Sequence, residues 1–472
     1  MIEAIPFEKI LKETLKEGGE FADLFFEQTR SVVIICEEDR IERVISGLDM
    51  GVGLRILHGG KTIYGFTNEI SEESLRHLAQ RLREATKGDE GSKMIHWTQR
   101  HPSSLPPSSF PNSLSGIEKH PKGISIGEKV SVVKRGNEVG RKFDPHVRQV
   151  KVLYRDGSQL LSIANSEGTV VEGERVGTVY SVQVISAEGD MIQTGYEPVG
   201  GRLGFELFDF HPPEEVAEIA TRRSLLMLSA RKAPMGRMAV VLSSEAGGTM
   251  IHEAIGHGLE ADLAQQGLSV YSEKIGERVA SPLITVVDDP TLPQKRGSYA
   301  FDDEGVSSRR TVLVEDGVLK SYLYDRLSAF KDGVESTGNG RRESYHHKPI
   351  PRMSNTMILP GKRKPEEIIR SVEKGLLVKK MGGGQVNTVN GDFVFEVNEG
   401  YLIEKGSVGE PVRGAILIGN GPRVLNEIDM VGEDLGFGIG TCGKDGQGVP
   451  VGDAQPTLRI PELVVGGQEE KP

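Results

Sequence analysis

Short apolar or alternating segments separated by glycine-containing turns run through most of this 472-residue chain, and they restrict it to folds rich in antiparallel strands. The first such segments are "ADLFFEQ" (22–28), "SVVIICEE" (31–38), "GVGLRILHGG" (51–60) and "TIYGFT" (62–67), which predict an antiparallel meander. Further hairpins are expected over 147–189, where Asp-Gly and Glu-Gly turns occur. From residue 237 onward, many glycine-rich strand segments with few helices favour a sheet closed or curled into a barrel.

Helical patterns interrupt the strands at four places. Helices are expected within 7–16, 71–88 and 212–233, and one more within 364–375. The stretch 97–122 is rich in proline and serine and has no periodicity, so it is interpreted as a linker or long loop. We therefore predict an α+β chain with an N-terminal mixed α/β sheet domain (1–233). A C-terminal antiparallel, barrel-like β domain (234–472) would follow it and carry the helix of a metal site.

The composition limits the partners and the compartment. The chain has 57 basic and 68 acidic residues, and this net charge of -11 argues against a nucleic-acid partner. The N-terminus is typical of an amphipathic helix and not of a signal peptide, and no apolar run nears the ~18 residues of a membrane span. Only Cys36 and Cys442 occur, too few for a disulfide framework, so a reducing, cytoplasmic location is expected. Cys36 ends an apolar run and is expected to be a small buried residue.

The segment "GGTMIHEAIGHGLEAD" (247–262) contains two histidines and a glutamate in an unusual spacing. Zinc hydrolases of the H-E-x-x-H type place their histidines at i and i+4 on one helix face. Here His252 and His257 are at i and i+5, and a regular helix would splay them by about 140°. A π-type bulge, or a break near Gly256, would bring them together. Histidine pairs on helices are also common as surface or core residues, so the pattern alone leaves both interpretations open.

A third ligand would favour the metal interpretation. Glu260 and Asp262 are close in sequence, but they could equally be solvated helix residues. Cys442 lies far away in a glycine-rich stretch without apolar neighbours, where packing does not account for it. Two histidines and one cysteine with an open fourth position form an established catalytic zinc arrangement. We therefore prefer Cys442, against the alternative of an ordinary loop thiol.

Several longer stretches resemble the TldD branch of the TldD/PmbA metallopeptidase family. They are "HEAIGHGLEAD", "FDDEG", "KPIPRMSNTMILPG" and "GTCGKDGQGVPVGDAQPTLRI", with "IANSEGTVVEGERV" and the N-terminal strand segments in addition. The resemblance covers nearly the whole chain and is weakest over 98–122. It implies that His252, His257 and Cys442 bind one Zn²⁺ per catalytic subunit and that Glu253 is the catalytic acid/base.

The family resemblance also implies an activity and partners. Family members degrade unfolded or short peptides and form homodimers, or heterodimers with an inactive TldE/PmbA-type paralogue; an older label is modulator of DNA gyrase. The intact motif implies the catalytic subunit, a cytoplasmic zinc metalloprotease in which Glu253 activates the zinc-bound water. Two alternatives remain: a metal-free hydrolase with Cys442 as nucleophile and His257 as base, and a non-catalytic peptide-binding or regulatory protein.

Three further groups have no part derived from the sequence. Tyr345, His346 and His347 are candidate oxyanion donors, although an exposed loop is the favoured interpretation. The acids Asp302, Asp303 and Glu304 could bind a cation, but clustered acids in a loop are usually solvated. The stretch "RMSNT" (352–356) has no predicted role.

Overall fold

The computed structural model describes residues 6–86 and 116–467. The predicted proline- and serine-rich linker therefore lies mostly outside the described residues, and only its end, from 116 to 122, is included. That end leads into the short 3₁₀ turn η3 (Pro121–Gly123). In the described part, no helix is long and apolar enough to cross a membrane.

The N-terminal half is one antiparallel sheet of long strands. Its strands are β1 (Phe21–Glu37), β2 (Arg40–His58), β3 (Lys61–Thr67), β4 (Val147–Asn165), β5 (Val170–Glu188) and β6 (Met191–Gly201). They are ordered β3-β2-β1-β4-β5-β6, and every neighbouring pair is antiparallel. The predicted meander is confirmed, but segments 22–28 and 31–38 form the single strand β1, because polar residues between them pair with β2 and β4 without a turn.

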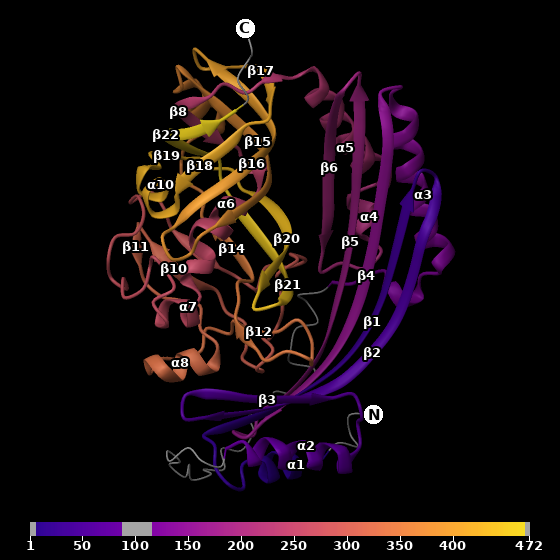
Figure 1. Ribbon diagram of the computed structural model, residues 1–472, viewed down its shortest axis with the longest axis vertical. Coiled ribbons are helices and arrows are strands. Elements are labelled where there is room, and N and C mark those ends of the chain that lie inside the picture. The colour runs from indigo at the N-terminus through magenta and orange to yellow at the C-terminus, as the bar shows by residue number, and fades with distance from the viewer. Residues whose placement is uncertain (1–5, 87–115, 468–472) are drawn as a thin grey trace.

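Helices cover two regions of this sheet (Figure 1). They are α1 (Phe7–Thr14), α2 (Glu72–Glu84), α3 (Ile126–Phe143), α4 (Leu207–Phe210) and α5 (Pro213–Ser229). Helices α1 and α2 pack on one end of the sheet, and α3 and α5 pack on its outer side, where Cys36 is fully buried as predicted. Helix α3 was not predicted, although Ser125 and Glu128 form a capping box at its start.

The C-terminal half contains a closed barrel and a second sheet. Its strands are β7 (Arg231–Lys232), β8 (Gly236–Leu242), β9 (Val286–Asp288), β10 (Thr311–Glu315), β11 (Val318–Leu319), β12 (Gly340–Arg341), β13 (Ile350–Pro351), β14 (Asn355–Ile358), β15 (Lys374–Val386), β16 (Asp392–Glu404), β17 (Ser407–Arg413), β18 (Ile416–Asn420), β19 (Met430–Val431), β20 (Gly436–Lys444), β21 (Gln447–Gln455) and β22 (Leu458–Gly466). Its helices are α6 (Thr249–Ile251), α7 (Ala261–Gln265), α8 (Arg326–Asp332), α9 (Pro365–Arg370) and α10 (Gly421–Glu427), with the short turns η4 (Ser244–Ala246), η5 (His252–Gly256) and η6 (His257–Leu259). Helix α9 matches the prediction, whereas α8 and α10 were missed.

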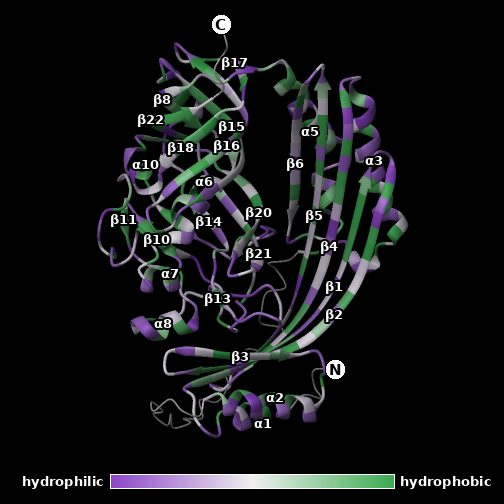
Figure 2. Ribbon diagram, viewed as in Figure 1, coloured by the Kyte–Doolittle hydropathy of each residue, from purple (hydrophilic) through white to green (hydrophobic). Residues whose placement is uncertain are grey.

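The barrel closes through five strands in the order β15-β8-β22-β18-β16, with β16 pairing back to β15. The prediction of an antiparallel barrel was wrong in one respect, because β8 and β15 are parallel. Parallel neighbours need a long crossover connection, and residues 243–373 supply it. That connection contains the histidine segment, so the barrel and the candidate site are linked by topology. Hydrophobic residues follow the barrel strands in Figure 2.

The second sheet of the C-terminal half carries Cys442. Its strand order is β11-β10-β9-β14-β21-β20, with β14 and β21 parallel and the other pairs antiparallel. Strand β20, which contains Cys442, is the outer strand of this sheet. One large hydrophobic core joins both parts of the C-terminal half and includes Ile251, Ile255 and Leu259 of the histidine segment.

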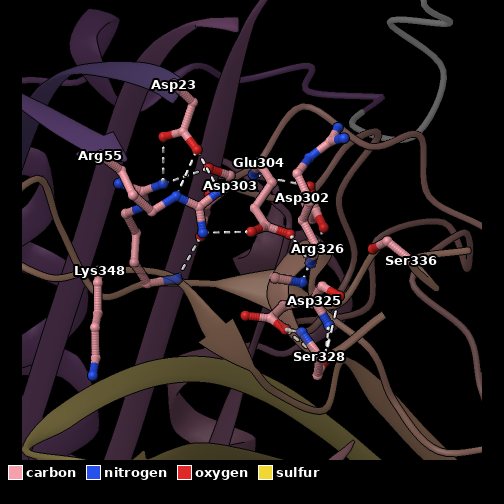
Figure 3. Close-up of polar contacts among 12 residues, drawn as sticks. Asp23, Arg55, Asp302, Asp303, Glu304, Asp325, Arg326, Ser328, Ser336 and Lys348 are labelled. Carbon is pink, nitrogen blue, oxygen red and sulfur yellow. Dashed lines mark hydrogen bonds and ion pairs between the residues drawn. The ribbon is translucent and has the colours of Figure 1, made fainter. Parts of the chain in front are cut away.

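A buried group of ion pairs joins the N-terminal sheet to the C-terminal half (Figure 3). Arg55 on β2 contacts Asp23 on β1 and, at 2.7 Å, the Oε1 atom of Glu304; all three side chains are fully buried. Arg175 on β5 pairs with Asp303. The interpretation of residues 302–304 as a solvated acidic loop was therefore wrong, because arginines of the N-terminal sheet neutralise two of the three acids.

Candidate metal centre

The chain between His252 and His257 forms a π-helical turn, η5, instead of a regular α-helix. The backbone N–H of His257 donates to the carbonyl of His252, five residues earlier, which defines the π turn. The predicted bulge or break is thus confirmed. It brings the two imidazole rings to a centroid distance of 5.1 Å at an interplanar angle of 87°.

The sequence favours this turn through a glycine and an apolar stripe. A Cβ atom at Gly256 would lie 2.1 Å from Sδ of Met353, so only glycine permits this close approach. Ile251, Ile255 and Leu259 are fully buried in the core and anchor the segment on its other side. Packing on both sides therefore fixes the direction of the histidines.

Cys442 approaches the histidines from β20. Its side chain is 3% exposed, and its Sγ atom is 3.4 Å from Nε2 of His257. One donor atom each from His252, His257 and Cys442 lie within 4.8 Å of one another. A tetrahedral zinc ion with ordinary Zn–S and Zn–N bonds separates sulfur from nitrogen by about 3.5 Å. The donor types and their spacing therefore fit a zinc ion.

The electrostatics of the three groups suit a metal ligand set. Burial alone would raise the pKa of the Cys442 thiol, but hydrogen bonds from His252 and His257 and their positive charge lower it to about 5. A thiolate is the form of cysteine that binds metals. For His257, burial lowers the pKa, and the nearby Glu260 carboxylate and Cys442 outweigh that effect and raise it well above the ordinary value.

Glu253 lies next to His252 on the same π turn and is half-buried. Burial raises the pKa of its carboxyl, and the two histidines offset part of the rise. Within the described residues its carboxylate forms no hydrogen bond or ion pair. A carboxylate with a raised pKa and free oxygens is suited to accept and return a proton.

Glu260 was left open as a solvated residue, and the structure shows that it is fully buried. Its Oε2 atom is 3.0 Å from Nδ1 of His257 and 3.1 Å from Nζ of Lys444. Its Oε1 atom is 3.9 Å from Nε of Arg352. Asp262 is half-buried and binds the same lysine, at 2.6 Å. Glu260 thus fixes the ring of one candidate ligand, as carboxylates commonly do beside metal-bound histidines.

The "RMSNT" stretch supports the strand that carries Cys442. Arg352 donates to the carbonyl of Cys442 and, at 3.2 Å, to that of Gln447. Ser354 and Thr356 both donate their hydroxyls to Asp288 of β9, which holds β14 beside β9. Sequence reasoning missed Arg352 and Lys444. The position of Lys444 two residues after Cys442 was the signal from which its place at the site could have been predicted.

The candidate oxyanion donors Tyr345, His346 and His347 do not lie at this site. Tyr345 is buried against the N-terminal sheet, where its backbone N–H donates to Glu27 at 2.7 Å. His346 is exposed, and its ring contacts that of Phe66. No described contact connects the trio to the histidine pair, so the interpretation as a surface loop holds for His346 but not for Tyr345.

Three family models match the chain. They are described as PmbA/TldA metallopeptidase domain 1, central domain and C-terminal domain, and they match residues 22–86, 119–228 and 235–467. The last of these contains all the candidate ligands.

Similar proteins and structures extend over almost the entire chain. The protein named "Metalloprotease TldD homolog" of Haemophilus influenzae is 37% identical over 95% of this chain and 93% of its own. "Zinc metalloprotease TldD homolog" of Saccharolobus solfataricus is 27% identical over 97% and 99%. A crystal structure of a candidate DNA gyrase modulator from Thermotoga maritima shares the fold, with a TM-score of 0.78 and 23% identity over 99% of this chain and 100% of that one. The crystal structure of TldE from Thermococcus kodakarensis has a TM-score of 0.75 and 18% identity over 98% and 99%.

Proposed function

Because this chain belongs to the PmbA/TldD metallopeptidase family, we propose that it is a zinc-dependent peptidase that hydrolyses peptide bonds in unfolded or short peptides. The observation that carries the proposal is the meeting of His252, His257 and Cys442, whose donor atoms lie within 4.8 Å. Zinc in the name of the Saccharolobus solfataricus relative supports the choice of metal.

In this proposal the chain's own residues have distinct roles. His252, His257 and Cys442 hold the zinc ion, which when bound polarises the substrate carbonyl and acidifies water. Glu253 removes a proton from the attacking water and returns it to the leaving amine. Its half-buried position raises its pKa toward the range in which it can do both. Glu260 keeps His257 in the orientation that points Nε2 at the metal position.

The substrate backbone is proposed to bind as an added strand. Strand β20 is the outer strand of its sheet and carries Cys442, so an extended peptide along this edge would pass the candidate ligands. Backbone recognition of this kind gives loose sequence specificity, which suits unfolded peptides. A structure with a bound peptide lying away from any sheet edge would contradict this part of the proposal.

The proposed assembly is a homodimer, or a heterodimer with an inactive TldE/PmbA-type paralogue. The shared fold of TldE from Thermococcus kodakarensis supports a paralogue of the same architecture. Light scattering of the purified chain, alone and mixed with such a paralogue, distinguishes the two assemblies. A strictly monomeric active protein would contradict both.

Metal analysis of the purified protein tests the site directly. We expect about one zinc per wild-type chain, and much less in Cys442→Ser. Glu253→Gln should keep its zinc and lose cleavage of an unfolded protein or a flexible peptide, because it removes the proton acceptor and leaves the ligands intact. Equal zinc in the wild type and in Cys442→Ser would remove Cys442 from the site.

One alternative has support from the geometry. The 3.4 Å contact between Cys442 and His257 and the low thiol pKa also suit a metal-free cysteine hydrolase. That mechanism leaves His252 and Glu253 without a role, and Cys442 is only 3% exposed. Activity that survives chelation would favour it, whereas activity lost on chelation and restored by zinc favours the metallopeptidase. A non-catalytic, regulatory protein instead predicts that Glu253→Gln leaves the biological effect intact.

A further inference from the structure

Three cations lie in the region where the N-terminal sheet approaches β20, and two of them, Arg202 and Arg296, are close enough for their charges to interact. Arg202 directly follows β6, and its Nε atom donates to the carbonyl of Ser298 at 2.9 Å. Lys295 places its Nζ atom 3.9 Å from the ring centroid of Phe437 on β20. Arg296 donates from Nε to the carbonyl of Gly440 on β20 at 3.0 Å. We call Arg202, Lys295 and Arg296 the cationic group.

The positive charge of the cationic group is not neutralised by the protein. None of its three members forms an ion pair with a carboxylate in residues 6–86 or 116–467; their partners are carbonyls, a hydroxyl and an aromatic ring. This is unexpected in a chain with 68 acidic and 57 basic residues. Asp303, whose charge acts on Arg202, is already paired with Arg175.

Further cations around the group add to its charge. Burial, and then the charges of Arg155 and Arg341, lower the pKa of Arg296 to about 10. Burial likewise lowers the pKa of Arg202. The pKa is lowered further by the positive charges of Arg175, Arg341 and Arg296. An anion placed among these side chains would relieve the repulsion between them.

The position of the group relates it to the candidate metal centre. Gly440 is two residues before Cys442 on the same strand, which is about 7 Å along an extended chain. The Nη2 atom of Arg296 also reaches Oγ1 of Thr441, the residue next to Cys442, at 3.4 Å. All three cations are partly exposed, and β6 lies beside β20 (Figure 1). A peptide extended along β20 would therefore present one of its residues to the cationic group.

We propose that the cationic group binds a carboxylate of the peptide substrate, so that the enzyme prefers peptides with an acidic group about two or three residues from the cleaved bond. This inference rests on the proposed peptidase function and specifies its substrate class. The carboxylate can belong to an Asp or Glu side chain or to a free peptide C-terminus. Arg296 is the central residue, because it contacts both Gly440 and Thr441 beside the candidate ligand.

Binding of matched peptides to zinc-loaded Glu253→Gln protein tests the proposal without turnover. The probes are fluorescein-labelled flexible decapeptides with either Glu or Gln at one internal position, each made with a free and an amidated C-terminus. Fluorescence anisotropy should show the Glu or free-carboxylate peptides binding about tenfold more tightly, a typical effect of one charge-assisted hydrogen bond. The preference should weaken as salt is raised from 50 to 500 mM, since ions screen partly exposed charges.

Variants of Arg296 test whether this residue causes the preference for acidic peptides. Arg296→Gln in the Glu253→Gln background should reduce the preference to about twofold or less, because a glutamine can still donate to Gly440 but carries no charge. Arg296→Lys should keep part of it. Arg141→Gln is the matched control, since Arg141 is an exposed arginine on α3, on the outer side of the sheet, and it should leave the preference unchanged. Comparison of the two termini tells whether side-chain or terminal carboxylates are recognised.

The possible failures are distinguishable. Equal affinity for acidic and neutral peptides overturns the inference, as does an Arg296→Gln variant, folded by circular dichroism, that weakens both peptides equally. If Arg296→Gln does not fold, Arg296→Lys takes its place: a folded Arg296→Lys variant that keeps part of the preference supports the inference, and one that weakens both peptides equally overturns it. Wild-type protein that cleaves both peptides without preference leaves the proposed function standing, whereas wild-type protein that binds acidic peptides more tightly but cleaves none contradicts the function alone.

Discussion

Substitution of Glu260 by glutamine tests whether the candidate metal centre depends on a buried charge behind its ligands. The Glu260 carboxylate is fully buried and lies 3.0 Å from His257, 3.1 Å from Lys444 and 3.9 Å from Arg352. It therefore connects the π turn to the strand that carries Cys442, since Lys444 lies on β20 and Arg352 donates to the Cys442 carbonyl. Glutamine keeps the size and removes the charge.

Two effects of Glu260→Gln can be estimated. Loss of a carboxylate that orients a metal-bound histidine typically lowers metal affinity by about 10- to 100-fold, or roughly 1.4–2.7 kcal/mol. Breaking a buried ion pair costs about 3–5 kcal/mol of folding free energy. Lys444 keeps its 2.6 Å contact with Asp262, so we expect the folding free energy of the metal-free protein to fall by about 3 kcal/mol, the lower end of that range.

Competition with a chromogenic chelator measures the zinc affinity, and urea unfolding of the metal-free protein measures the stability. Asp262→Asn is the matched control, because Asp262 contacts Lys444 but has no contact with His257. It should change the zinc affinity less than about threefold, since it removes no contact to a candidate ligand. The reasoning is refuted if Glu260→Gln binds zinc as tightly as the wild type, or if both variants lose the same affinity.

Three other substitutions test the packing and the buried charges. Burial and Glu304 raise the pKa of Asp325 to about 7, so the folded protein retains a proton that the unfolded chain (pKa about 3.9) releases. The contribution of this proton to the free energy of unfolding is complete below about pH 4 and is lost as the pH rises to about 7, at roughly 1.4 kcal/mol per pH unit. Asp325→Asn should remove this pH dependence, which urea unfolding across that range measures. Gly256→Ala should cost about 1–3 kcal/mol by overpacking against Met353 and lower the melting temperature, with partial recovery in a Gly256→Ala/Met353→Ala double variant. Arg55→Met should cost about 3–5 kcal/mol in urea unfolding, because it leaves the buried carboxylate of Glu304 without its ion-pair partner; a loss below about 1 kcal/mol would contradict that account.

The features that the sequence predicted correctly depend on neighbours along the chain. The antiparallel strands follow from alternation and glycine turns, and the caps of α2 follow from Ser71 and the acids after it. The π turn followed from the five-residue spacing of His252 and His257 with Gly256 between them. Local conformation of this kind is encoded within a few residues, so it can be inferred without the rest of the fold.

The features that were missed depend on distant residues. Helix α3 was hidden by glycines inside it, and Gly136 is required because a Cβ atom there would lie 2.0 Å from the hydroxyl of Tyr180 on β5. The parallel pairing of β8 and β15 depends on a crossover whose path no local pattern specifies. The burial of Glu260, Asp303 and Glu304 could not be inferred either, since their arginine and lysine partners come from other parts of the chain.

The division of the candidate ligands over two distant segments has a consequence for the newly made protein. Cys442 and His257 are 185 positions apart, so the chain closes a very long loop before the thiolate meets the histidines. While the chain is being synthesised, the histidine pair emerges well before β20 and β21 exist to dock beside β14. In the proposed peptidase, the candidate metal centre therefore lacks one of its three ligands until nearly all of the C-terminal half has folded.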